Sequence, residues 1–325
     1  MNLGKDLLDI DQLDEVQIKG ILESARQFKD VSSRAIKKLP TLRGKTVSTL
    51  FFEPSTRTRI SFELAAKRLS ADVVSFSVAT SSRTKNESLI DTVRTLEVMG
   101  VDLFIVRHGV AGACHQIARM TSASVLNGGD GAHAHPTQAL LDLYTLQEHR
   151  GSLEGARVLI VGDILYSRVA RSNIHGLLRM GAHVTLVGPP TLIPIGIEKM
   201  GVSVSYDLDA SLPGADVVMM LRLQNERQQA GLLPSIREYV NLYQLTPARL
   251  RRSSPGCIVM HPGPMNRGVE IHPQVADGRQ SVIEEQVANG VAVRMALLYL
   301  LMANRSQVPP GGVRRATTLP GGLTT

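Results

Sequence analysis

Apolar runs of strand length alternate with segments of helical spacing along most of the chain. Residues 45–53 and 157–163 are typical of buried strands, and residues 11–28 and 284–302 repeat apolar positions every three or four residues, as helices do. This alternation is typical of parallel sheets that helices cover on both faces, so the sequence predicts an α/β fold. In the first helix the repeating apolar residues are Leu13, Val16, Ile21, Leu22, Ala25 and Phe28.

A Gly-rich polar segment, GSLEGA at residues 151–156, interrupts the alternation, which then restarts. The break divides the chain into two units, residues 1–150 and 151–285, and both are of ordinary domain size. Residues 305–325 are rich in Pro, Gly and Thr, a composition typical of a disordered tail. Further strands are predicted at 71–77, 101–108, 124–129, 183–188, 202–207, 215–222 and 257–263, and further helices from 55 and at 87–99, 135–150 and 167–180.

Composition limits the partners that this chain is expected to have. Its 325 residues carry a net charge of +7, but the basic residues are spread along the chain, so we do not expect nucleic-acid binding. The two cysteines form neither a disulfide framework nor a metal-binding spacing, and the acidic N-terminal segment is unlike a signal peptide. No apolar run is expected to reach the length of a membrane span. The sequence therefore predicts a cytoplasmic protein without a membrane partner.

The polar-rich clusters share one position, because each follows a predicted strand. In open parallel sheets, ligands bind beyond the carboxyl ends of the strands. The shared position therefore predicts one composite site made from both units. The clusters are EPSTRTR (53–59), RHG (107–109), GGDGAHAHPTQ (128–138), GDILYSR (162–168), RLQNER (222–227) and HPGPMNR (261–267).

The segment PSTRTR places hydroxyls and arginines where a buried strand turns into a helix. A helix N-terminus leaves backbone N–H groups unpaired and carries partial positive charge. Ser55, Thr56 and Thr58 add hydroxyl donors, and Arg57 adds a planar fork that matches phosphate oxygens. The alternative is ordinary N-capping by Ser55 or Thr56 with arginines in solvent. So many donors in succession favour a phosphate site.

The remaining clusters contain candidates for carbonyl and carboxylate binding. His135 stands just before Pro136 at a predicted helix start, where a neutral imidazole can donate to an oxyanion; a structural histidine is the alternative. Arg222 and Gln224 lie on one side of an extended chain end and could bind a carboxylate. Arg168 follows another strand, although taken alone each arginine could also be a surface residue.

Common nucleotide and metal motifs are missing from the sequence. No G-x-x-x-x-G-K-S/T occurs, and VGDILYSRVARS lacks the glycines of a dinucleotide site. His133 and His135 have no matching Asp or Cys cluster, so they are not expected to bind a metal.

The motifs FFEPSTRTRISFE, HPTQALLDL, VGDILYSRVARSN and MHPGPMNRGVEI, in this order, resemble the aspartate/ornithine carbamoyltransferase family. The resemblance covers about residues 1–304. It implies a domain for carbamoyl phosphate, a domain for the amino acid and a C-terminal helix, residues 286–304, that packs back on the first domain. It also implies a homotrimer with active sites shared between neighbouring chains, and neither a metal nor an organic cofactor. The HPGP segment and the Arg-x-Gln spacing at Arg222 favour L-aspartate over ornithine as the acceptor.

The resemblance assigns a role to each matched residue. Glu53 would support the arginines. Carbamoyl phosphate would be bound by Ser55, Thr56, Arg57, Thr58, Ser81, Arg107, His135, Gln138, Gly263 and Pro264. The catalytic residues would be Arg57, Thr58, Arg107, His135 and Gln138. L-Aspartate would be bound by Lys85, Arg168, Arg222 and Gln224, with Ser81 and Lys85 supplied by the neighbouring chain.

The sequence departs from the family pattern at two positions, and it leaves several alternatives open. Asn86 stands where the family usually has Gly, and Gly263 stands where larger residues are common. Ser82 could serve in place of Ser81. The acceptor could be ornithine or N-acetylornithine, or the chain could be an inactive homologue that serves as a scaffold. The sequence does not decide whether regulatory chains or a dihydroorotase bind the trimer.

Overall fold

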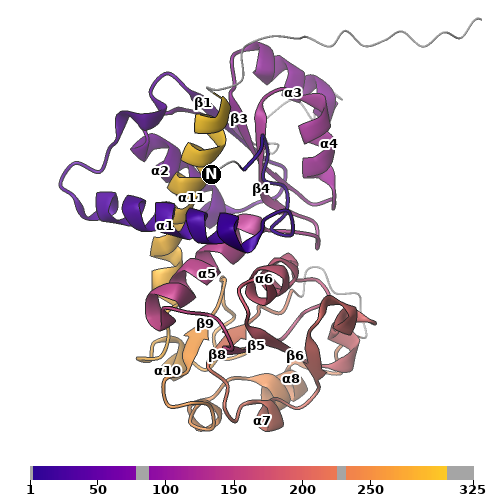
Figure 1. Cartoon of the computed structure of the whole chain (residues 1–325). Helices are drawn as coiled ribbons and strands as arrows, with labels where there is room; N and C mark the ends of the chain where they lie inside the picture. Colours follow the sequence, from indigo (N-terminus) through magenta and orange to yellow (C-terminus); the bar gives the residue numbers. More distant parts are fainter. Residues whose placement is uncertain (1–2, 78–87, 225–231, 306–325) are drawn as a thin grey trace, which may run out of the picture.

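The computed structural model describes residues 3–77, 88–224 and 232–305, which form two α/β domains (Figure 1). In the described part of the first domain, four parallel strands lie in the order β2-β1-β3-β4. The strands are β1 (Thr46–Phe51), β2 (Asp72–Ser77), β3 (Leu103–His108) and β4 (Ser124–Asp130). The helices are α1 (Glu15–Ser33), α2 (Thr56–Arg68), α3 (Leu89–Val98), α4 (Ala113–Met120) and α5 (Pro136–Arg150), with a short 3-10 turn, η1 (Pro40–Leu42).

Helices cover both faces of the first sheet. Successive residues of a strand point to opposite sides, so each strand contributes to both cores. Leu50 and Phe104 pack in one core with α3 and α4. Val47 and Leu103 pack in another core with α1, α2 and α5. The first domain is therefore doubly wound, as predicted.

The described strands of the second domain form a five-stranded parallel sheet in the order β7-β6-β5-β8-β9. Val158 and Ile160 face α6, and Leu159 and Val161 face α8. The strands are β5 (Arg157–Val161), β6 (His183–Val187), β7 (Ser203–Ser205), β8 (Val217–Met220) and β9 (Ile258–Met260). The helices are α6 (Arg168–Arg179), α7 (Leu208–Ser211), α8 (Ile236–Tyr243), α9 (Pro247–Leu250) and α10 (Pro273–Ala276), with 3-10 turns η4 (Pro190–Leu192) and η5 (Ile197–Met200).

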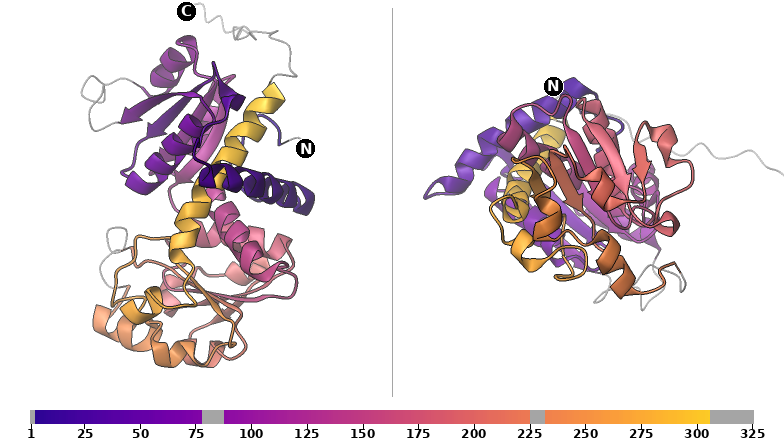
Figure 2. Two further views of the ribbon diagram at one scale, coloured as in Figure 1. Left: turned by 90° about the vertical axis from the view of Figure 1, so that its left-hand side faces the viewer. Right: turned by 90° about the horizontal axis from the view of Figure 1, so that it is seen from below.

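Helix α11 (Ile283–Arg305) begins beside the second domain and runs back along the first, where it packs against α1, α2 and α5 (Figure 2). This confirms the predicted fold class. The helix includes Arg305, which was expected in the tail, and residues 306–325 lie outside the described residues. Its segment Ile283–Ala303 is long and apolar enough to cross a membrane, by length and composition only, so the expectation that no run reaches that length is wrong. Most of the segment is buried, and buried core helices of other proteins have the same length and apolar composition.

Some local predictions differ from the structure. Val16 was placed on the apolar face of the first helix, but it is 77% exposed, and Ile18 is buried instead. Helices α4 and α8 were not predicted; α4 is amphipathic but short, and its N-cap residue is Gly112, which has no side chain to make a capping hydrogen bond. Periodicity over eight residues gives two turns, too few to separate a helix from a loop.

The strand order of each sheet indicates where a ligand is expected to bind. It reverses between β1 and β3 in the first sheet and between β5 and β8 in the second. Crevices at such reversal points are where open α/β sheets bind ligands. The polar segments after β1, β5 and β8, together with Arg107 near the end of β3, lie at these two points.

Candidate active site

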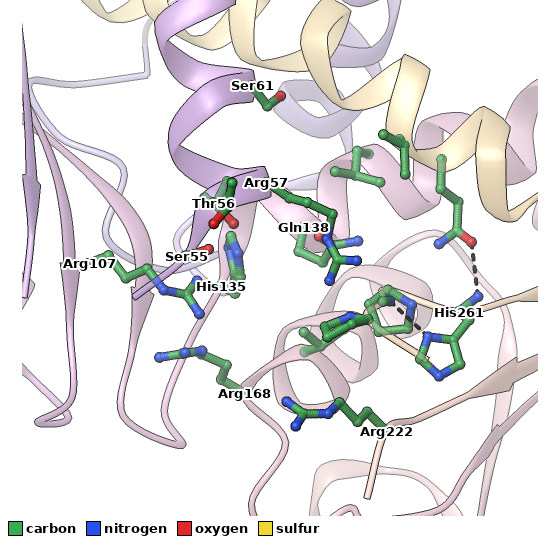
Figure 3. Close-up of a pocket in the computed structure, with 18 of the residues that line it drawn as sticks. Ser55, Thr56, Arg57, Ser61, Arg107, His135, Gln138, Arg168, Arg222 and His261 are labelled. Atoms are coloured by element: carbon green, nitrogen blue, oxygen red, sulfur yellow. Dashed lines mark hydrogen bonds between the residues drawn. The ribbon is translucent and has the colours of Figure 1, made fainter. Parts of the chain in front are cut away.

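A cavity of about 710 Å³ lies between the two domains at the reversal points of both sheets. It brings together every predicted site residue that the structure describes, and Figure 3 shows many of them converging from both domains. Ser81 and Lys85, with Ser82 and Asn86, lie outside the described residues. The predicted residues lining the cavity are Glu53, Ser55, Thr56, Arg57, Thr58, Arg107, His135, Gln138, Arg168, Arg222, Gln224, Gly263 and Pro264.

The N-terminus of α2 opens into this cavity. Ser55 is the N-cap residue, with extended backbone, yet within the described part of the chain its side chain makes no capping hydrogen bond. The hydroxyls of Ser55, Thr56 and Thr58 line the cavity together with Arg57. This geometry favours the anion site over the alternative of ordinary capping, because a capping serine would accept from the helix backbone.

Arg57 reaches from α2 across to the HPGP segment of the second domain (Figure 3). A Cβ atom at Gly263 would lie 2.9 Å from Arg57 Nη1, and Gly263 has a φ of +59°, which other residues rarely adopt. A larger residue here would therefore collide with the guanidinium. Burial, and then the charge of Arg222, lower the pKa of Arg57, although an arginine stays protonated in any ordinary buffer.

Glu53 holds two arginines that come from different domains. Arg168 donates to Glu53 Oε2 at 2.8 Å, and Arg107 Nε lies 3.6 Å from the same oxygen. Arg107 also donates to the carbonyl of Gly128. A Cβ at Gly129 would approach Arg107 Nη1 to 3.0 Å and Arg168 Nε to 3.2 Å, so glycine makes room for both guanidinium groups. These contacts put Glu53 beside the two arginines that it is predicted to support.

His135 is the N-cap residue of α5 and is 4% exposed. Its pKa is lowered well below the usual value, first by burial and then by the positive charges of Arg107, Arg168 and Arg294. The imidazole is therefore neutral near pH 7. A neutral imidazole can donate one N–H to an oxygen that develops negative charge.

Arg222 and Gln224 follow β8 and extend to the part of the cavity that the second domain lines. Gln224 donates through Nε2 to the carbonyl of Tyr166 at 3.1 Å, and its backbone N–H donates to Asp163 Oδ2 at 3.3 Å. These bonds tie the segment after β8 to the segment after β5, which also carries Arg168. The three side chains thus share one wall, as a carboxylate site requires.

The sequence-based reasoning gave no role to several lining residues, among them Arg294, His261 and Gln286. Arg294, in α11, is 4% exposed, donates to Ser61 Oγ at 2.7 Å and lies over the ring of Phe62. Burial lowers its pKa to about 10. The signal was a single arginine inside an apolar helix, since buried charges are costly and rarely kept without a role. His261 is the first residue of the HPGP segment, and Gln286 accepts its backbone N–H.

The electrostatics of the cavity select anions. Five arginines line it, whereas Glu53 is the sole carboxylate among the described lining residues. Guanidinium groups in a partly dry cavity favour phosphates and carboxylates, which they can bind in pairs of hydrogen bonds. The excess of positive charge fits two anionic ligands bound side by side.

The fold and the site together define a two-domain α/β protein of the class that brings two anionic small molecules together between its domains. The chain belongs to the aspartate/ornithine carbamoyltransferase family. The family model "Aspartate/ornithine carbamoyltransferase, carbamoyl-P binding domain" matches residues 5–148. The model "Aspartate/ornithine carbamoyltransferase, Asp/Orn binding domain" matches residues 154–301.

Relatives of known name agree with this assignment. The chain is 61% identical over 297 residues to an aspartate carbamoyltransferase catalytic subunit of Halothermothrix orenii, covering 91% of this chain and 95% of the relative. It is 60% identical over 298 residues to the subunit of the same name from Moorella thermoacetica, covering 92% of this chain and 97% of the relative.

Solved structures show how far the fold is shared. Aspartate transcarbamoylase from Trypanosoma cruzi, in complex with carbamoyl phosphate and aspartate, superposes with a TM-score of 0.84 at 31% identity, covering 91% of this chain and 96% of that one. Ornithine carbamoyltransferase from Pyrococcus furiosus gives 0.82 at 28% identity, covering 92% and 97%. Because both enzymes share the fold, the fold does not by itself identify the amino acid.

Proposed function

We propose that this chain is an aspartate carbamoyltransferase, which transfers the carbamoyl group of carbamoyl phosphate to the amine of L-aspartate and releases phosphate. The observation that carries the proposal is the arginine-rich cavity between a helix N-terminus of one domain and the Arg222 segment of the other. The relatives of about 60% identity are named for this activity, which supports aspartate as the acceptor.

The geometry suggests how the reaction is promoted. The N-terminus of α2 and Arg57 would hold the phosphate, and the guanidinium groups of Arg168 and Arg222 would hold the carboxylates of aspartate. The aspartate nitrogen attacks the carbonyl carbon, and negative charge develops on the carbonyl oxygen. Thr58, Arg107 and neutral His135 would stabilise that charge. The bond to phosphate then breaks, and the leaving phosphate takes the amine proton, so the reaction needs no protein base.

The first prediction concerns the acceptor. With carbamoyl phosphate in excess, L-aspartate should be carbamoylated at least about a hundredfold more efficiently, in kcat/KM, than L-ornithine, because the arginines that attract a second carboxylate repel an ammonium group. N-Acetylornithine serves as a further comparison. Preference for either ornithine compound would favour the alternative transferase, and the absence of turnover with all three amines would favour an inactive scaffold.

We further propose a homotrimer in which each site uses Lys85 of the neighbouring chain. The support is the family assignment and the fact that the cavity contains no lysine among the described lining residues. The second prediction is rescue by mixing. Arg57→Ala and Lys85→Ala chains, each inactive alone, are dissociated, mixed in equal amounts and reassembled. In a ring of three, every mixed trimer has one boundary where an intact Arg57 meets an intact Lys85.

About three quarters of randomly mixed trimers contain both variants, and each has one working site in three, so about a quarter of wild-type activity should return. Each variant taken alone through the same treatment is the control. Mixed trimers that native mass spectrometry detects but that stay inactive would mean that Lys85 does not complete a neighbour's site.

We also propose a role in pyrimidine biosynthesis in the cytoplasm. The names of the relatives support the pathway, and the two buried, unpaired cysteines agree with a reducing compartment. Partner chains such as a regulatory subunit or a dihydroorotase would bind outside the cavity. Copurification of the tagged chain from its native cells would detect them.

A further inference from the structure

Three side-chain amides point their nitrogens at one buried carboxylate, that of Asp142 on α5. Gln138 Nε2 donates to Oδ1 at 2.9 Å, Gln286 Nε2 donates to Oδ1 at 2.8 Å, and Asn173 Nδ2 donates to Oδ2 at 2.8 Å. The three amides come from α5, α11 and α6, and Asp142 and Asn173 are completely buried. The carboxylate therefore lies where both domains and the C-terminal helix meet.

The chemistry of Asp142 fixes how these amides are turned. An ionised carboxylate accepts hydrogen bonds and donates none, so each amide must present its NH2 group to Asp142 and its oxygen away from it. Burial raises the pKa of Asp142 to about 6, and the three hydrogen bonds oppose the rise. Above that pH the group is mainly a carboxylate. The orientation of each amide therefore follows from the fact that only its nitrogen can donate to the carboxylate.

This orientation extends to two parts of the cavity. With its nitrogen held by Asp142, Gln138 leaves Oε1 for the cavity that it lines. With its nitrogen held likewise, Gln286 accepts the backbone N–H of His261 at 3.0 Å through Oε1 (Figure 3). His261 in turn donates from Nε2 to Glu270 at 3.1 Å and accepts the Gly263 N–H at Nδ1, so the start of the HPGP segment is fixed as well.

We propose that Asp142 is a positioning residue that makes the site selective for carbamoyl phosphate by holding Gln138 Oε1 as a hydrogen-bond acceptor for the carbamoyl NH2 group. The inference rests on the proposed function, because it assumes that the carbamoyl group lies beside Gln138. A site that presents a fixed acceptor prefers a ligand with NH2 to one with CH3 at the same place, since the methyl group leaves the acceptor unpaired. Acetyl phosphate is that ligand, with the same phosphate and the same carbonyl.

The third prediction follows from the Asp142→Leu variant, which keeps the shape of the side chain but removes the acceptor. The Gln138 amide is then free to turn its NH2 group towards the substrate. We expect kcat/KM for carbamoyl phosphate to fall about tenfold to a hundredfold. The inhibition constants of acetyl phosphate and of inorganic phosphate, as competitors of carbamoyl phosphate, should change less than about threefold, because neither ligand donates to Gln138.

Asn173→Leu is the matched control. It also replaces a buried polar residue of the same cluster by leucine, but it leaves the bond between Gln138 and Asp142 in place. We expect this variant to have a lower melting temperature than the wild type. Its kcat/KM for carbamoyl phosphate, compared with the affinity for acetyl phosphate that its inhibition constant gives, should stay within about threefold of the wild-type ratio. If Asp142→Leu does not fold, the double variant Asp142→Leu/Asn173→Leu, which strands one donor fewer, is compared with Asn173→Leu.

Each outcome decides the proposal. A selective loss for carbamoyl phosphate in the Asp142 variant supports it. An equal loss for all three ligands, an equal loss in the Asn173 control, or an unchanged ratio in a folded Asp142 variant overturns it. Failure of the wild-type chain to form carbamoyl aspartate would instead overturn the proposed function, so the two failures are distinguishable.

Discussion

Replacement of Arg57 by alanine should lower kcat by at least about a hundredfold, and by several orders of magnitude if the guanidinium also orients the phosphate. Arg57 lines the cavity at the N-terminus of α2 and lies against Gly263 of the other domain. In the proposed reaction the leaving phosphate gains negative charge as its bond to carbon breaks, so a fixed positive charge there stabilises the transition state more than the bound substrate. Steady-state assays with both substrates saturating measure the effect on kcat.

Arg59→Ala is the control for this fourth prediction. Arg59 lies on the same helix two residues later, outside the cavity lining, and its Nε is 3.8 Å from Glu63 Oε1. A partly exposed pair of this kind contributes little to stability, so the variant should keep activity within about twofold of wild type. Near wild-type turnover in Arg57→Ala, or equal losses in both variants, would show that the N-terminus of α2 is not the phosphate site.

Replacement of Arg222 by alanine should raise the KM for L-aspartate about tenfold to a hundredfold and the KM for carbamoyl phosphate less than about threefold. Arg222 follows β8 in the second domain, and its segment is tied by Gln224 to the segment that carries Arg168. Loss of a charged pair of hydrogen bonds to a carboxylate weakens the ligand that carries the carboxylate. This fifth prediction is measured by varying each substrate with the other saturating.

Arg237→Ala provides the matched control, because Arg237 is an exposed arginine of the same domain, on α8, outside the cavity lining. Both KM values should stay at their wild-type level. If Arg222→Ala weakened the two substrates equally, the division of the cavity into a phosphate part and a carboxylate part would be wrong.

The sequence alone predicted the features that depend on neighbours in the chain. The buried strand before Ser55 and the run of donors after it are local, and they predict an anion site at the start of a helix. The position of polar segments after strands also predicted one composite cavity, because parallel strands end at the same edge of a sheet. The tertiary structure adds how Arg57 and Gly263 meet, which requires both domains.

Other parts of the site could not be predicted, because they depend on contacts between distant segments. Gln286 and Asp142 are 144 residues apart, and their hydrogen bond exists because α11 returns to pack on α5. In the sequence, Arg294 is only a charged residue within an apolar helix. The structure adds its hydrogen bond to Ser61, which is distant in the chain. Val16 is a case in which the local pattern misleads. Its spacing predicts a buried position, but it lies on the exposed side of α1.

The central claim is that one cavity joins the carbamoyl carbon of carbamoyl phosphate to the nitrogen of L-aspartate. The most direct test is nuclear magnetic resonance of the purified chain turning over carbamoyl phosphate labelled with ¹³C and L-aspartate labelled with ¹⁵N. The account predicts a product carbon split by direct coupling to ¹⁵N, formed together with one equivalent of phosphate. Release of phosphate without a carbon coupled to ¹⁵N would mean that the chain hydrolyses carbamoyl phosphate or leaves aspartate unused, and it would contradict the account.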